Sequence, residues 1–431
     1  MDKVVEKKAP KKKKDYSKLL VFIQKYAMII VLVLTIILFS ILTPVIKGIP
    51  FITPDNINNL IAQNGYVFIL ATGMLLCILT GGNIDLSVGS VVCFVGAVGA
   101  KFLVFAERAE LNMTLTVFIA VVIMLLVGTA IGAMQAFWIA YVRIPPFIVT
   151  LAGMLLFRGL GNAVLKSQTA LINNPLYSKL FGGGAACYIP DFIGNTIEKA
   201  TGKEVPIDIV CVFAGIIAIA IFIFFEVSNR IKRKKKNYEV SKMFPWIFKM
   251  VVLSLVIGAI TFFLALCKGV PSMLVIVMII IIVYSYITSN TTEGRYFYAI
   301  GGNEKATKLS GINTNRTLFL AYTNMGFLAA VAAIVIVARA NGASPSSGIN
   351  FEMDAISSCF VGGASAYGGI GTVSGSIIGA ALMGVINQGM SILGTSQDSQ
   401  KIIKGLVLLL AVIFDVVSKR GFKLLAKNDN R

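Results

Sequence analysis

The sequence predicts an all-α fold, a polytopic bundle of about ten transmembrane helices in which some helices are interrupted. Of its 431 residues, 57% are hydrophobic and 14% are charged, and the mean hydropathy is +0.84. Apolar runs of about 18 residues or more, the length that crosses a bilayer as a helix, recur along the whole chain. Basic residues lie in patches between these runs. Because cytoplasmic connections carry an excess of Lys and Arg, these patches indicate on which side of the membrane each connection lies.

Composition excludes several classes of protein. The chain contains no histidine, which removes histidine proton relays, histidine metal sites and catalytic pairs of serine or cysteine with histidine. Its 6 cysteines lack C-x-x-C spacing, so we expect free thiols, no disulfide and no metal site. The net charge is +19, but the basic residues that produce it lie in short patches between the apolar runs and not on a soluble domain. We therefore expect no nucleic-acid partner. We also expect no enzyme activity and no bound cofactor, because no nucleophile and base pair is present.

The first element is a basic cytoplasmic tail, residues 1–18, which precedes the first apolar run. That run is too long for the core of a signal peptide and no small-residue cleavage site follows it, so we expect an uncleaved span. The transmembrane domain covers residues 19–418, and a second cytoplasmic tail covers 419–431. The apolar runs predict spans over residues 19–42, 66–79, 88–105, 113–141, 146–164, 208–225, 247–266, 270–287, 317–337, 374–393 and 402–417.

The connections between spans differ in composition. Residues 43–65 fall outside, and their asparagines are typical of a short amphipathic surface helix. Residues 166–207 form a long external loop of nearly balanced charge, either a cap that meets an external partner or an insertion without a role. Residues 226–247 are a strongly basic cytoplasmic loop, and residues 290–316 are a second cytoplasmic loop. Two lysines fit this topology poorly because they fall on the outer side: Lys401 and Lys404.

One stretch, GGNIDLSVGS at residues 81–90, interrupts an apolar run. Its paired glycines free the backbone to bend, and the carboxylate of Asp85 costs about 3 kcal/mol at the centre of a membrane unless it has partners or water. Asp85, Ser87 and Ser90 are helix-starting residues, so we expect a helix to restart here. Two interpretations stay open: a tight cytoplasmic turn with a solvated Asp85, or a broken helix that reaches into the core.

A second glycine-rich stretch repeats this pattern near the C-terminus. Residues 352–361 are too short to cross a membrane, and 6 glycines follow within residues 362–375. The segment GGIGTVSGS there resembles GGNIDLSVGS, and such paired breaks indicate a repeat-built transporter whose pathway lies between its halves. Gly371, Gly375 and Gly379 recur at every fourth residue, so we expect them on one helix face, for packing within the chain or at a dimer seam.

The most informative connection is TEGRYFYAIGGNEKATKLSGINTNR at residues 292–316. Between Gly302 and Gly311 it predicts a short helix with Asn303 as its N-cap and Gly311 as its stop. We expect this helix to turn charged residues to a soluble partner and to pack its apolar side on the membrane domain. The charged residues are Glu304, Lys305 and Lys308, and the apolar ones are Ala306 and Leu309. From these residues alone, an ordinary solvated helix is an equally good interpretation.

Four stretches resemble the signature segments of membrane permeases from ABC importers for monosaccharides, the ribose, galactose and xylose type. They are GGNIDLSVGS, RIPPFIVTLAGM at 143–154, GRYFYAIGGNEKATKLSGI at 294–312 and DAISSCFVGGASAYGGIGTVSGSIIGA at 354–380. They follow the family's order and, with the spans between them, cover most of residues 50–418; the form of the third resembles the xylose and multiple-sugar branch most. The tripeptide Met134-Gln135-Ala136 departs from the Asn-Gly that often precedes the RIPP segment in the family.

The resemblance implies a permease subunit in the bacterial inner membrane that lets a monosaccharide through and leaves ATP hydrolysis to another chain, since this one has no GxxxxGK[ST] loop. The expected partners are an ABC ATPase subunit, an extracytoplasmic sugar-binding protein, a second permease protomer in a homodimer or a pair of like subunits, and membrane lipid. The residues expected to couple to the ATPase are Gly302, Asn303, Glu304, Lys305, Ala306, Lys308, Leu309 and Gly311. Those expected to line or gate the pathway are Gly81, Gly82, Asn83, Asp85, Ser87, Gly362, Gly363, Gly368, Gly369 and Gly371, with Gly375 and Gly379 in helix packing.

Two alternatives remain open. A branched-chain amino-acid permease of the same superfamily shares such glycine breaks. An ion-coupled secondary carrier acting alone is disfavoured, because histidine is absent and because the carboxylates Asp354 and Asp415 fall near span ends.

Overall fold

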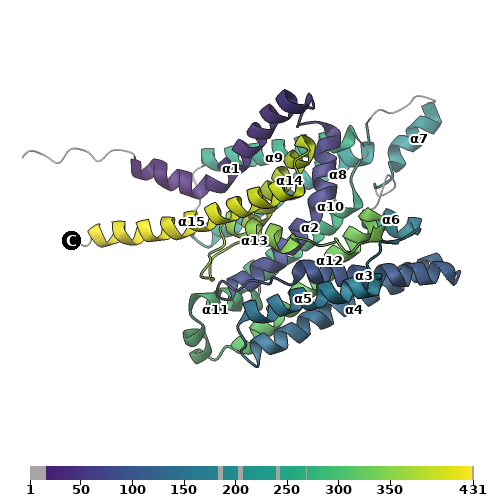
Figure 1. Cartoon of the computed structure of the whole chain (residues 1–431). Helices are drawn as coiled ribbons and strands as arrows, with labels where there is room; N and C mark the ends of the chain where they lie inside the picture. Colours follow the sequence, from purple (N-terminus) through teal and green to yellow (C-terminus); the bar gives the residue numbers. More distant parts are fainter. Residues whose placement is uncertain (1–15, 183–187, 202–206, 239–242, 268, 430–431) are drawn as a thin grey trace, which may run out of the picture.

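Figure 1 shows the computed structural model, which describes residues 16–429 except for 183–187, 202–206, 239–242 and 268. Most of the predicted N-terminal tail, residues 1–15, therefore lies outside the described residues. The described chain is helical apart from loops and one ladder of two short strands. The helices are α1 (Tyr16–Lys47), α2 (Pro54–Leu79), α3 (Val88–Arg108), α4 (Met113–Ala140), α5 (Pro146–Leu165), α6 (Pro175–Phe181), α7 (Phe192–Thr201), α8 (Ile209–Lys235), α9 (Met243–Ala265), α10 (Ser272–Asn290), α11 (Thr292–Leu309), α12 (Thr314–Ala340), α13 (Phe351–Val361), α14 (Val373–Leu393) and α15 (Gln397–Asp429).

The predicted fold class, an all-α transmembrane bundle with interrupted helices, is confirmed. Within the described chain, 10 helices are long and apolar enough to cross a membrane: α1, α2, α3, α4, α5, α8, α9, α10, α12 and α14. The helix α11 lies at one end of the bundle, toward the left in Figure 1, while α6 and α7 lie at the other end. We call these two ends the α11 end and the α6 end. The predicted last span, residues 402–417, lies within α15.

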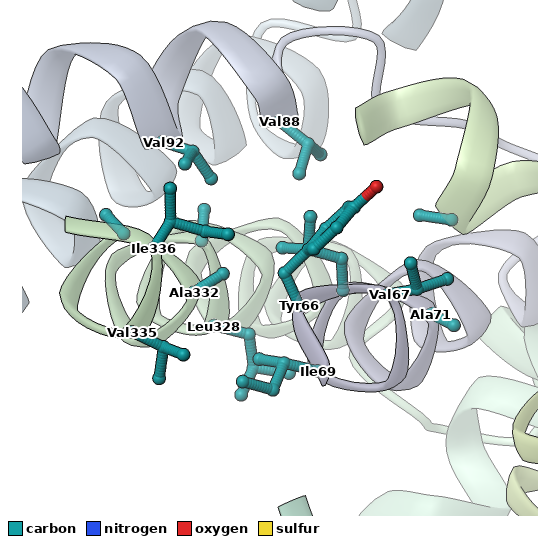
Figure 2. Close-up of a cluster of buried hydrophobic side chains, with 14 of the residues drawn as sticks. Tyr66, Val67, Ile69, Ala71, Val88, Val92, Leu328, Ala332, Val335 and Ile336 are labelled. Atoms are coloured by element: carbon teal, nitrogen blue, oxygen red, sulfur yellow. The ribbon is translucent and has the colours of Figure 1, made fainter. Parts of the chain in front are cut away.

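The centre of the bundle is formed by α2, α3, α12 and α14, which bury 78, 67, 72 and 61% of their most apolar windows. Figure 2 shows side chains of α2, α3 and α12 packed together, among them Tyr66, Val88 and Leu328. Lipid is as apolar as these side chains, so close packing and polar contacts, more than exclusion of water, hold such helices together. The hairpin of α8 and α9 lies at the periphery, and its windows are only 11 and 6% buried.

The predicted external loop, residues 166–207, is fastened to the bundle in its described parts. β1 (Ala170–Leu171) pairs antiparallel with β2 (Gly342–Ala343), which follows α12. In α6, Tyr177 is fully buried and its Oη donates a hydrogen bond to the carbonyl of Ile334 (3.0 Å). This loop therefore closes the α6 end of the bundle from within the same chain.

One local prediction is wrong. Residues 43–65 do not hold a separate surface helix, because α2 runs without a break from Pro54 to Leu79 and buries Asn58 and Asn64. The side chain of Asn64 accepts a hydrogen bond from Nδ2 of Asn387 in α14 (3.1 Å). A buried amide needs such a partner, so Asn64 joins α2 to α14 in the interior of the bundle.

Candidate functional site

The first glycine break is a buried turn between α2 and α3, two helices that are each long enough to cross a membrane. After Leu79 the chain leaves the helical conformation through Gly81 and Gly82, both with positive φ, and α3 starts only at Val88. Asp85 is 3% exposed, so the expectation of a solvated carboxylate is wrong. The expectation of a turn between two spans is confirmed, because α2 and α3 are each long enough to cross a membrane. Asn83 lies beside it and donates a hydrogen bond from Nδ2 to the carbonyl of Thr80 (3.3 Å).

Partners within the same turn satisfy the carboxylate of Asp85. Its Oδ1 accepts hydrogen bonds from the backbone N–H (2.8 Å) and the Oγ (2.7 Å) of Ser87, which precedes the first residue of α3. Asp85 thus stabilises the start of α3 from two residues upstream, while Ser87 itself occupies the N-cap position.

A residue that the sequence did not single out as functional completes this turn. The Oγ of Ser87 lies 3.0 Å from Oε1 of Gln135 in α4, and Gln135 is 2% exposed. The sequence marked Gln135 only as a departure from the family pattern. The sequence did contain a signal for this contact: Gln135 is a lone amide within an apolar run, and a buried amide requires a polar partner.

The second glycine break lies between α13 and α14. The helix α13 has 11 residues, which reach about 16 Å, or half the thickness of a bilayer core. The chain from Gly362 to Thr372 is not helical, and φ is positive at Gly363, Gly368, Gly369 and Gly371. One detail of the prediction is wrong: Gly371 precedes α14, which starts at Val373, so it does not share a helix face with Gly375 and Gly379.

Gly375 and Gly379 lie where α14 crosses α13. A Cβ at Gly375 would come within 2.2 Å of the carbonyl oxygen of Gly362, and one at Gly379 within 1.9 Å of that of Ser358. No side chain fits at such a distance from backbone. The close approach between these two helices within one chain therefore accounts for both glycines.

The two breaks and the predicted coupling segment meet at the α11 end, at a set of residues that we call the glycine junction: Gly81, Gly82, Gly301, Gly368 and Gly369. The backbone N–H of Gly369 donates to the carbonyl of Leu79 (3.0 Å), which joins the second break to the end of α2. A Cβ at Gly301 would lie 1.9 Å from that same carbonyl oxygen and 2.2 Å from the nitrogen of Gly369. Three segments that are distant in sequence thus touch through their backbones alone.

The coupling segment itself forms the second half of α11. Asn303 has non-helical φ and ψ of −165° and 102°, which divides α11 into two helical pieces. Its Oδ1 accepts a hydrogen bond from the N–H of Ala306 (3.0 Å), so Asn303 is the N-cap that the sequence predicts. Gly311 follows the end of the helix with φ of 86°, as expected of a C-terminal stop.

The predicted orientation of this short helix is wrong. Leu309 is 90% exposed and Ala306 is exposed too, so the apolar side does not pack on the membrane domain. The inner position belongs to Thr307, which is buried and whose Oγ1 lies 2.9 Å from the carbonyl oxygen of Ala299. Leu309 follows Thr307 by two residues, or about 200° around a helix, and therefore points away from the bundle.

The prediction that all three charged side chains of this helix face a partner is also wrong in part. Lys305 and Lys308 are exposed, but Glu304 forms an ion pair with Arg143 of the RIPP segment. Arg143 lies between α4 and α5, and its Nη2 also donates to Oγ1 of Thr314, at the start of α12 (3.3 Å). Glu304 thus ties α11 to the bundle, and the free face of the helix carries lysine and leucine.

A second polar group lies deeper in the bundle, among Tyr66, Asp354 and Lys404. Oη of Tyr66 donates to Oδ2 of Asp354 (2.7 Å), and Nζ of Lys404 lies 2.8 Å from Oδ1 of the same carboxylate. Asp354 is 1% exposed, and Tyr66 stands 12 residues, or about 18 Å, along α2 from its start at Pro54. The expectation of a carboxylate at a span end is therefore wrong for Asp354, because the half-length helix α13 begins inside the bundle.

This polar group also explains Lys404, which the predicted topology left unpaired. An ionised residue within a membrane protein needs a partner of opposite charge, and Lys404 finds Asp354 on α13. Arg158 of α5 donates hydrogen bonds to the carbonyls of Ser347 (2.7 Å) and Gly348 (3.2 Å). These two hydrogen bonds fix the segment that leads into α13. Asp415, the other carboxylate of the prediction, has no described side-chain environment.

Comparison with known proteins adds an independent finding. A family described as the permease component of branched-chain amino acid transport systems matches residues 56–412. A xylose transport system permease protein from Haemophilus influenzae is 32% identical over 92% of this chain and 97% of its own length. The xylose transport system permease protein of Escherichia coli K12 is 30% identical over 86% of this chain and 87% of its own. The ribose import permease protein of the same strain is 32% identical over 85% of this chain and 87% of its own. No solved structure matches the chain.

Proposed function

We infer, from the premise that this chain belongs to the ABC-importer permease family matched at residues 56–412, that it forms the membrane pathway for a monosaccharide. Membership makes it a multi-pass transport protein. The curated relatives at about a third identity carry xylose or ribose in their names, so a pentose is the substrate class that we propose. Two copies of the chain, or a pair of like subunits, would enclose the pathway between them.

The α11 end is proposed to face the cytoplasm. The C-terminal turns of α8 carry basic residues at this end, which is the pattern of a cytoplasmic connection: Arg230, Lys232, Arg233, Lys234, Lys235 and Lys236. In this orientation both termini are cytoplasmic. The α6 end, closed by the described parts of residues 166–207, is then outside, where a sugar-binding protein would deliver its ligand.

The observation that carries the proposal is the exposed face of the second half of α11. Leu309 is 90% exposed on this capped helix, directly after Lys308 and one turn after Lys305, and such a surface suits burial against a soluble protein. We propose that an ABC ATPase subunit receives this helix in a groove and moves it during its cycle.

The glycine junction supplies a route from that helix to the pathway. Gly301 stands two residues before the N-cap Asn303 and contacts the end of α2 and the second break through backbone atoms. Side chains could yield to a displacement, whereas backbone in contact with backbone transmits it. Movement of α11 would therefore shift both breaks together.

Polar groups buried inside the bundle would suit a sugar when movement of α11 opens the bundle toward the pathway between the two copies. The carboxylate of Asp85, the amide of Gln135 and the Tyr66 and Asp354 pair offer donors and acceptors inside an otherwise apolar bundle. A monosaccharide carries hydroxyl groups that need such partners during passage, while an aliphatic amino acid needs them only at its two charged groups. This difference favours a sugar over the branched-chain amino acids in the family's description.

Two other functions can be separated by uptake assays. In cells that express the complete system, competition by pentoses against leucine distinguishes a sugar permease from a branched-chain amino-acid permease. The buried carboxylates Asp85, Glu352 and Asp354 give some support to an ion-coupled carrier. For such a carrier, uptake would survive ATP depletion and collapse with the ion gradient.

The coupling role is tested by Leu309→Asp, with Tyr238→Ser as its matched control at the same end. Tyr238 is 61% exposed and lies outside α11. Burial of one leucine stabilises a complex by about 1.5–3 kcal/mol, so Leu309→Asp should weaken copurification of the ATPase subunit about tenfold or more. Equal copurification by both variants would remove α11 from the interface and leave membership in the family intact.

A further inference from the structure

A groove runs between α8 and α9 of the hairpin, and its lining follows α9 from Trp246 to Phe262. Its volume is about 800 Å³, and its lining is apolar apart from Ser254. Ile219 and Ile223 contribute from α8, and Met250 and Leu255 are among the residues from α9. Neither the sugar pathway nor the coupling helix uses this surface, because the hairpin packs on the bundle only through a small part of its area.

A cationic group stands at the end of the groove. Trp246 lines the groove, and the guanidinium carbon of Arg230 lies 4.5 Å from the centroid of its ring. The Nη1 atom of Arg230 is buried and has no hydrogen-bond partner within the described part of the chain. A buried donor on a charged group is costly unless something accepts from it, so this atom points to a missing anionic partner.

The charges around Arg230 leave this position strongly basic. Glu226 is one turn earlier in α8 and is already paired with Lys249 of α9. The five residues Lys232, Arg233, Lys234, Lys235 and Lys236 follow Arg230 at the end of α8. An anion at this level therefore meets one partly buried guanidinium and a run of exposed cations.

The stretch of α8 between Arg230 and the groove residue Ile219 matches one lipid leaflet in length. Arg230 stands 11 residues after Ile219, which corresponds to about 16 Å along α8, and half of a bilayer's hydrocarbon core is about 15 Å. Tryptophan is enriched at the level of the headgroups, where Trp246 would lie. A chain that begins at Arg230 and runs down the groove would thus end near the middle of the membrane.

We propose that this groove binds an anionic phospholipid of the leaflet at the α11 end. Its phosphate pairs with the guanidinium of Arg230, its headgroup lies among the following lysines, and one acyl chain occupies the groove between α8 and α9. Bound there, the lipid covers apolar surface of two helices that pack on each other but have little contact with the rest of the bundle.

The chain offers a direct probe, because it contains only 2 tryptophans. In the full-length Trp138→Phe variant, Trp246 is the single source of tryptophan fluorescence. The protein is reconstituted into vesicles that contain brominated phosphatidylglycerol or brominated phosphatidylcholine, since bromine quenches a tryptophan in contact with the lipid. We expect phosphatidylglycerol to compete for the site about fivefold better for each basic residue that contacts it, and the preference to fall as salt is added.

Arg230→Gln in the same background should reduce that preference by about fivefold, whereas Arg108→Gln, at the far end of α3, should leave it unchanged. Equal quenching by the two lipids in the parent protein would overturn the proposal, because the groove would then hold lipid without selecting an anion. Absence of quenching by either lipid would also overturn it and would indicate a protein occupant, such as a second copy of this chain. The parent protein alone decides between these results, even if Arg230→Gln does not fold.

Discussion

The hairpin of α8 and α9 is more hydrophobic than the central helices α2 and α14, yet far less of it is buried. The mean hydropathy of the most apolar window is 2.8 in α8 and 2.4 in α9, against 1.7 in α2 and 1.5 in α14. The buried shares run the other way, at 11 and 6% against 78 and 61%. In a soluble protein the most apolar helix would be the most buried, so the reversal reflects lipid as the solvent.

The difference between the two regions shows which residue types suit contact with lipid and which suit contact with protein. Lipid accepts isoleucine and phenylalanine freely, so the hairpin needs nothing else on its outer face. The central helices meet protein over most of their surface, and there glycine permits backbone contact while Asn, Gln and Asp find partners across helices. Glycine and polar residues within a span therefore indicate a helix face that packs on other helices, and bulky apolar residues indicate a face that contacts lipid.

The largest expected effect compares two adjacent glycines at the α11 end. A Cβ at Gly301 would lie 1.9 Å from a carbonyl oxygen, whereas at Gly302 nothing lies within 4 Å. Gly301→Ala should abolish uptake, because overpacking against backbone costs at least about 1–3 kcal/mol and displaces the glycine junction. Gly302→Ala should keep uptake near that of the parent chain. Similar uptake by the two variants, at matched expression, would mean that the junction does not transmit movement.

The next effect compares two lysines in α15. Lys404 is 13% exposed and pairs with buried Asp354, while Lys401 is 52% exposed and pairs with Asp398. Lys404→Met leaves a buried carboxylate unpaired and should lower the free energy of unfolding by about 3–5 kcal/mol, against about 0–1 kcal/mol for Lys401→Met. Thermal unfolding of the purified protein in detergent measures both. The double variant Asp354→Asn with Lys404→Met should recover stability, and failure to recover it would contradict a simple ion pair.

A smaller effect concerns the charge of Asp85. In Asp85→Asn the amide oxygen still accepts from Ser87, so the fold should persist, but a hydrogen bond to a charged group of about 1.5–3 kcal/mol becomes a neutral one of about 0.5–1.5. We expect initial uptake rates to fall about tenfold. Asp398→Asn, which changes a carboxylate that is 87% exposed, serves as the control and should not alter uptake. A well-expressed Asp85→Asn protein with normal uptake would exclude Asp85 from the pathway.

The smallest effect is expected in the hairpin. At Gly258 of α9 a Cβ would meet only Cδ1 of Ile219, at an ordinary contact distance of 3.8 Å. Gly258→Ala should leave uptake unchanged and raise stability by up to about 1 kcal/mol, because alanine favours helix. A loss of uptake or a lower unfolding temperature would show that the hairpin is packed as tightly as the centre.

Local spacing allowed the sequence to predict the two breaks, the cap at Asn303 and the stop at Gly311. Each of these depends on residues within one turn, where glycine, aspartate and asparagine have definite backbone preferences. The same logic located the spans, because lipid requires long apolar runs whatever the tertiary structure.

Contacts between residues that are distant in the sequence could not be predicted from local spacing. Lys404 looked misplaced until the fold brought Asp354 beside it from 50 residues away, and Gln135 looked like a mere departure until it met Ser87. Leu309 was assigned to the buried side because leucine usually is buried, but the inner position went to Thr307. Where a helix belongs at an interface with another protein, the rule that apolar residues face inward gives the wrong side.

Reconstitution into sealed vesicles tests the central claim most directly, that this chain is a passive permease driven through α11 by a separate ATPase. Purified protein would be assayed for accumulation of radiolabelled pentose, first alone under an imposed ion gradient and then with its copurified ATPase subunit, sugar-binding protein and ATP. The account predicts accumulation above the external concentration only in the second case. Uphill accumulation by the chain alone would contradict it.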